Sequence, residues 1–76
     1  MKIYTKEELS LRNGQSLSEI WIAYKGKIYD VTNSTLFKGG KHFKLSTGID
    51  LTNQIDNAPH TDELLNDFTV VGFLKD

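Results

Sequence analysis

The sequence predicts a small α+β domain with a mixed β-sheet and short helices. A chain of 76 residues is long enough for one domain, so residues 1–76 are expected to fold as a single unit. Segments rich in β-branched and aromatic residues alternate with short helical patterns, and no repeat, linker or low-complexity segment interrupts them. A domain of this size has a marginal core, which a cofactor often supplements.

Capping and turn signals predict the first elements. Residues 2–4 form a short strand-like segment. Thr5 followed by Glu8 is a capping box, which starts a short helix that continues to about Leu11. Gly14 supplies a left-handed turn after this helix.

The rest of the sheet is predicted from strand and hairpin signals. Residues 20–24 and 27–31 are two strand-like segments joined by Lys25-Gly26, which is typical of a tight hairpin. Residues 68–74 are β-rich and are expected to close the sheet.

Helical segments are expected between these strands. Helical turns are predicted around 34–37, before Gly39-Gly40 interrupts them. A helix is predicted from Asp50, whose carboxylate can cap the free amides, to Ile55. The next helix is predicted over 61–67, because acidic residues in its first turn suit the helix dipole.

Composition argues against several functional classes. Nine basic and ten acidic side chains give a net charge of −1, which is unlike a general nucleic-acid binder. The absence of cysteine rules out disulfides, thiolate ligands and iron–sulfur clusters. No nucleophile elbow, phosphate loop or His-Glu metal helix is present, so we expect a protein that is not an enzyme. Met1 leads into an amphipathic, acidic segment and no apolar run approaches about 20 residues, so we expect a cytoplasmic monomer without a membrane span.

The two histidines are the strongest candidates for a functional site. His42 closes a glycine-rich loop, and His60 follows a proline ahead of an apolar helical pattern. Both imidazoles are therefore expected at the ends of loops, with room for one short helix between them. They could face each other across an apolar cleft and bind a haem iron from opposite sides. A lone loop histidine such as His42 is more often simply solvated, and His60 could instead be a polar residue at the start of a helix.

Apolar residues bracket both histidines. They are Leu36, Phe37, Phe43, Leu45, Ile49, Leu51, Ile55, Leu64, Leu65 and Phe68. Such residues form the ordinary core of a domain, but a porphyrin needs an apolar cleft of the same kind, so the two interpretations overlap. If imidazoles fill both axial positions, the iron has no open site, and outer-sphere one-electron transfer is the expected chemistry.

Charge is unevenly distributed around the two histidines. Residues 38–44 contain three lysines and no acid, whereas residues 56–67 contain four acids and no base. Charge runs are usually solvated surface. The alternative is a polarised rim, in which the lysines lie near haem propionates and the acids face an unidentified redox partner protein.

Four motifs occur in a fixed order along the chain. They are Tyr29-Asp30-Val31-Thr32, Phe37-Lys38-Gly39-Gly40-Lys41-His42, Thr47-Gly48-Ile49-Asp50-Leu51-Thr52 and Ala58-Pro59-His60. Each motif alone is weak evidence for any one protein family, but the four motifs in this order and at this spacing are fairly specific. The chain resembles the cytochrome b5-like haem/steroid-binding domain family, in particular its compact prokaryotic members, over nearly its whole length. This resemblance implies a small mixed sheet with short helices that form a haem crevice.

The resemblance also implies the site residues, with one departure. Well-known cytochromes b5 place the first axial histidine directly before Pro-Gly-Gly, where this chain has Phe37, which cannot bind iron. The implied metal ligands are therefore His42, as in the compact branch, and His60, around a non-covalent haem b. The implied apolar contacts of the haem are Phe37, Phe43, Leu45, Leu51, Ile55 and Leu64. The implied function is soluble one-electron transfer, and the alternative is a haem or steroid-like ligand module without that role.

Overall fold

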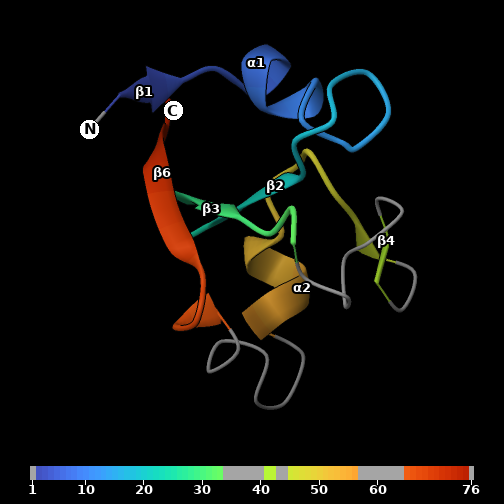
Figure 1. Ribbon diagram of the computed structural model, residues 1–76. Helices are drawn as coiled ribbons and strands as arrows, with labels where there is room; N and C mark the ends of the chain where they lie inside the picture. The colour runs from blue at the N-terminus through green and yellow to red at the C-terminus, as the bar shows by residue number, and fades with distance from the viewer. Residues whose placement is uncertain (1, 34–40, 43–44, 57–64, 76) are drawn as a thin grey trace.

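The computed structural model describes residues 2–33, 41–42, 45–56 and 65–75, which form a mixed sheet with one helix on each face (Figure 1). The elements in chain order are β1 (Ile3–Tyr4), α1 (Lys6–Ser10), β2 (Trp21–Tyr24), β3 (Lys27–Asp30), β4 (Lys41–His42), β5 (Leu45–Ser46), α2 (Thr52–Asp56) and β6 (Thr69–Leu74). The four-stranded sheet has the order β1-β6-β3-β2, with β6 parallel to β1 and antiparallel to β3. β4 and β5 form a separate antiparallel pair. The predicted α+β class with a mixed sheet is confirmed.

The capping box predicted at the start of α1 is present. Thr5 Oγ1 accepts a hydrogen bond from the Glu8 N–H at 3.1 Å, and Glu8 Oε1 accepts one from the Thr5 N–H at 2.9 Å. The Thr5 N–H lowers the pKa of Glu8, because it stabilises the charged carboxylate. A carboxyl group with a lowered folded-state pKa adds stability above its unfolded pKa, and this is lost as the pH falls through the folded one. The capping box should therefore weaken in acid.

The β2–β3 hairpin turns through Lys25 and Gly26, as predicted. Their φ angles are 50° and 81°, which is the combination that a two-residue type I′ turn requires. The pairing begins at Trp21 with Asp30. β2 thus starts one residue later, and β3 ends one residue earlier, than the sequence predicts.

β2 is buried on both faces and separates two apolar clusters, because alternate side chains of a strand point to opposite faces of a sheet. The α2-side cluster consists of Ile20, Ile22, Val31, Leu51, Ile55 and Leu65. The α1-side cluster consists of Leu9, Trp21, Ala23 and Ile28. The core therefore has two layers, and the sheet lies between them.

The second half of the chain departs from prediction in three places. α2 begins at Thr52 instead of Asp50, although the Asp50 carboxylate accepts a hydrogen bond from the Thr52 N–H at 3.0 Å, as expected of a cap. β6, expected as the closing strand, lies inside the sheet, because the short β1 pairs with its outer side. The β4–β5 pair was not predicted. The turns expected around 34–37 lie outside the described residues, as does most of the helix expected over 61–67.

Gly72 lies where β6 passes close to β1. A Cβ atom built there would lie 2.5 Å from the carbonyl oxygen of Lys2 and 2.7 Å from a ring carbon of Tyr4. Gly72→Ala should lower the free energy of unfolding by about 3 kcal/mol, because the backbone oxygen can move only by disturbing the β1–β6 pairing. The matched control is Gly26→Ala, which meets nothing within 4 Å. Its positive φ alone should cost about 1 kcal/mol, so equal shifts of the two urea midpoints would contradict the close approach.

Candidate functional site

The predicted site residues Leu51 and Ile55 lie in the α2-side cluster. They are 0% and 2% exposed and pack together with Leu65, which lies just before β6. The Leu51 N–H donates to the carbonyl oxygen of Ala23 at 2.8 Å, which fixes the entry to α2 against the edge of β2. The fully buried members of this cluster carry no ionisable group. They form a buried apolar layer between the sheet and α2, and we call the α2-side cluster the apolar floor in this sense.

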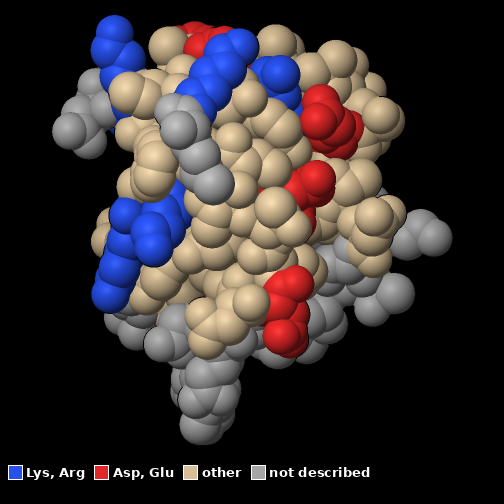
Figure 2. All heavy atoms as spheres, turned by 60° about the vertical axis from the view of Figure 1, so that its left-hand side comes forward, with Lys and Arg blue, Asp and Glu red and all other residues tan. Residues whose placement is uncertain are grey.

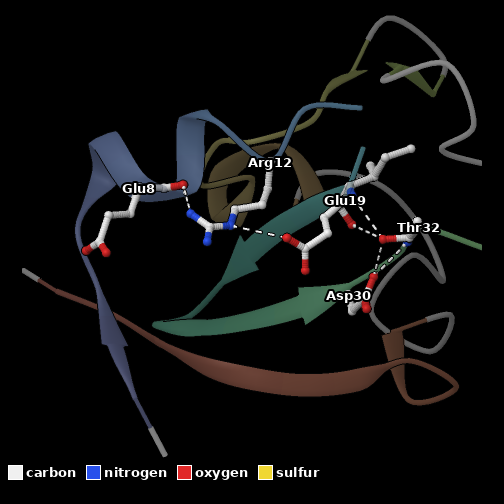
Figure 3. Close-up of polar contacts among 6 residues, drawn as sticks. Glu8, Arg12, Glu19, Asp30 and Thr32 are labelled. Atoms are coloured by element: carbon white, nitrogen blue, oxygen red, sulfur yellow. Dashed lines mark hydrogen bonds and ion pairs between the residues drawn. The ribbon is translucent and has the colours of Figure 1, made fainter. Parts of the chain in front are cut away.

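The Asp-X-Thr motif Asp30-Val31-Thr32 holds the start of β2 through hydrogen bonds. Thr32 Oγ1 accepts a hydrogen bond from the Ile20 N–H at 2.9 Å and donates one to Asp30 Oδ1 at 2.5 Å (Figure 3). The Thr32 N–H also donates to Asp30 Oδ1, at 2.9 Å. Val31, in the middle of the motif, is fully buried in the α2-side cluster.

The same motif recurs at the other end of β2. Thr52 Oγ1 accepts a hydrogen bond from the Lys25 N–H at 2.9 Å and donates one to Asp50 Oδ1 at 2.5 Å. Its middle residue, Leu51, enters the same cluster as the middle residue of the first motif. The two motifs therefore fix the chain at opposite ends of β2. Both Asp-X-Thr motifs can be read in the sequence. The backbone groups that they bind are remote along the chain, so the sequence did not predict that the two motifs act at the two ends of one strand.

The structure places the remaining predicted site residues only in part. His42 lies in β4, where it pairs with Leu45 of β5. The expected loop end is therefore corrected to a short strand, which is held by pairing with residues that follow it. The other predicted site residues lie outside the described residues: Phe37, Phe43, His60 and Leu64.

Ile49, one of the apolar residues predicted to bracket the histidines, is exposed. It is 40% exposed and borders a hollow of ≈ 370 Å³ together with Lys6 and Leu9 of α1. The Ile49 carbonyl oxygen accepts a hydrogen bond from the Ala23 N–H at 3.1 Å, so this segment runs along the edge of β2. Ile49 is therefore not among the buried residues of the α2-side cluster.

Arg12 is a partly buried residue that the sequence did not single out. Its guanidinium carbon lies 4.6 Å from the centroid of the Trp21 ring and 5.5 Å from that of Tyr4. Nη1 donates to the Glu8 carbonyl oxygen at 2.8 Å, and Nε lies 3.8 Å from Glu19 Oε1 (Figure 3). These contacts join the end of α1 to the α1 face of the sheet. Arg12 is therefore a structural residue on the face opposite α2.

The chemistry available on the α2 face is apolar. Within the described ranges, no three His, Cys, Asp or Glu side chains gather in a way that could hold a metal ion. In the same ranges, no helix has the length and apolar character needed to cross a membrane. The described part of the α2 face thus offers buried apolar side chains and no metal-binding cluster.

Comparison with known proteins identifies relatives over almost the whole chain. The sequence model described as "Cytochrome b5-like Heme/Steroid binding domain" matches residues 5–75. A solved cytochrome b5 domain protein from Hadesarchaea is 54% identical and has a TM-score of 0.90, over 99% of this chain and 100% of that one. One from Methanococcoides burtonii is 49% identical with a TM-score of 0.89, over 99% of both chains. No curated protein matches.

A more distant structure shows how widely the fold extends. A hypothetical protein from Arabidopsis thaliana with a cytochrome b5 like fold is 21% identical, with a TM-score of 0.73 over 100% of this chain and 93% of that one. The predicted resemblance is thus confirmed, and so is the fold that it implied. From the match over residues 5–75 and the two archaeal structures, the chain belongs to the cytochrome b5-like haem/steroid-binding domain family.

Proposed function

We propose that this protein binds haem b non-covalently through His42 and His60 and acts as a soluble one-electron carrier. The observation that carries the proposal is the arrangement around α2. His42 lies in β4, His60 follows α2 along the chain, and α2 and the residues around it contribute to the buried apolar floor of the α2-side cluster. Membership of a haem/steroid-binding family supports haem as the ligand.

The donor chemistry of the chain fits haem b. The chain has two histidines and no cysteine, so imidazole is available for axial ligation, whereas thiolate ligation and thioether attachment are not. The buried apolar residues of the α2-side cluster would add no competing charge near such a haem. When bound, the haem supplies a ferric/ferrous couple. The work of the protein is to hold the iron through neutral imidazole nitrogens and to keep water from it with apolar side chains.

The second candidate is a ligand module without electron transfer. The family description names steroids as well as haem, so an apolar ligand above the same floor is the alternative occupant. A redox role needs two filled axial positions, whereas a sensing or carrier role tolerates an open or exchangeable one. Coordination state therefore separates the two candidates.

The test is a visible absorption spectrum of the protein loaded with haem, followed by reduction and reoxidation. We expect a six-coordinate low-spin spectrum that returns unchanged after the cycle, because neither ligand has to leave when the iron changes its charge. A high-spin spectrum, or haem that exchanges readily into apomyoglobin, would favour the ligand module. Failure to take up haem would overturn the one-electron carrier and leave only a module for another apolar ligand.

A further inference from the structure

Two large apolar side chains lie exposed and side by side on the sheet. Ile3 is 61% exposed and Phe73 is 41% exposed. They are direct partners in the β1–β6 pairing, so their side chains leave the sheet on the same face. Single exposed apolar residues are ordinary in small proteins, but an adjacent pair of this size is a candidate contact surface.

Two lysines lie beside this pair. Lys27 lies directly opposite Phe73 on the other side of β6, and its side chain is exposed. Lys75 lies two positions after Phe73 and is also exposed. Lys2 lies on the other face, because its Nζ is 5.2 Å from the centroid of the Tyr4 ring, which packs on the α1-side cluster. We call Ile3, Phe73, Lys27 and Lys75 together the β1–β6 patch.

The clustering of lysines is a property of this side of the molecule, since the chain as a whole has a net charge of −1. Figure 2 brings the side of β1 and β6 forward and shows basic side chains over its upper and left-hand parts, with apolar and polar surface between them. Acidic side chains lie mostly along the right-hand side of the same view. A partner with acidic side chains around an apolar centre would complement both the positive charge and the apolar surface of the patch.

A second copy of this chain does not complement the patch. An isologous contact would set the lysines of one copy against those of the other, with no acid of the patch to neutralise them. Pairing through the free edge of β1 is also disfavoured, because β1 has two residues and follows Lys2. Short edge strands with lysine are a common protection against such pairing.

We propose that the β1–β6 patch is the docking surface for an acidic protein partner, whose apolar side chains cover Ile3 and Phe73 while its carboxylates meet the lysines. Two exposed apolar residues and two lysines suit a small, transient, electrostatically steered interface. In Figure 1, β1 and the C-terminal end of β6 lie well away from β4 and from the lower end of α2. A partner bound there leaves that side of the molecule uncovered. The inference does not depend on haem binding.

The test is an NMR titration of the isotope-labelled full chain with a short peptide of alternating glutamate and phenylalanine. Amide shifts should be concentrated in residues 2–4, 26–28 and 72–75, and they should shrink at high salt, because exposed charges are then screened. Phe73→Ser and Lys27→Glu should each weaken binding about tenfold, as expected for central contacts of an interface. Leu17→Ser is the matched control, since Leu17 is 38% exposed and lies outside the patch. Leu17→Ser and the wild-type protein should bind the peptide with the same affinity.

Several results would overturn the proposal. They are peptide-induced shifts that map elsewhere or are absent, equal binding of a glutamine–phenylalanine peptide, and unchanged affinity in both patch variants. Binding to phosphatidylserine vesicles without binding to the peptide would assign the patch to a lipid surface instead. Shifts of the patch amides that depend on protein concentration alone would assign it to a second copy. Thermal melts of the two patch variants show whether they are folded, and because Phe73 and Lys27 are exposed we expect them to be.

Discussion

Replacing His42 or His60 by alanine is expected to abolish the six-coordinate low-spin spectrum of the haem-loaded protein. These are the only two histidines of the chain, so no third imidazole can take over a vacated axial position. An alanine variant should therefore show a five-coordinate or water-ligated, high-spin iron. Visible absorption of each variant, reconstituted in parallel with wild type, measures the effect.

Two controls separate loss of a ligand from loss of the fold. Gln54→Ala changes an exposed residue of α2 and should leave the spectrum unchanged. Free imidazole added to an alanine variant should restore the low-spin spectrum, because the small ligand can enter the space left by the side chain. If either histidine variant keeps the wild-type spectrum without imidazole, that histidine is not a ligand, and a methionine or lysine takes its place.

Loading with haem is expected to raise the melting temperature strongly. A domain of this size buries only about 60% of the surface of its unfolded chain, so its own core leaves little margin. A ligand that binds only the folded state stabilises it by mass action, by about 4 kcal/mol when its free concentration is 1,000 times Kd. A gain of this size corresponds to many degrees for a small domain. Paired thermal melts of the apo and holo proteins measure the shift.

Hydrogen exchange locates the same effect along the chain. In the apo protein, amides of residues 36–68 should exchange faster than those of the hairpin formed by β2 and β3, and haem should slow the former group most. The hairpin acts as an internal control, because its turn and pairing are fixed by local residues. Equal melting temperatures with and without haem would contradict the coupling between cofactor and fold.

Local signals predicted the elements that depend on neighbouring residues. The Thr5–Glu8 capping box and the Lys25-Gly26 turn are both present, because each is satisfied by bonds within a few positions of the chain. The inner position of β6 could not be predicted in this way, since it depends on pairing with β1 at the far end of the sequence. The β4–β5 pair was missed for a related reason: two-residue strands leave almost no periodic pattern.

The burial of the apolar residues of the candidate site was predictable only in part. Leu51 and Ile55 lie in one buried cluster, as their spacing on a helix suggested. Ile49, only two positions before Leu51, is 40% exposed, whereas Leu51 is fully buried. The two residues are both apolar, so their type alone does not reveal which of them is covered by other elements of the fold.

Electron paramagnetic resonance of the ferric, haem-loaded protein tests the central claim most directly, because the signal reports the axial ligands of the iron. Two imidazoles should give a rhombic low-spin signal as the dominant species, and the His42→Ala and His60→Ala variants should each lose it. A dominant axial high-spin signal in the wild-type protein would contradict ligation by both histidines, and with it the proposal of a one-electron carrier.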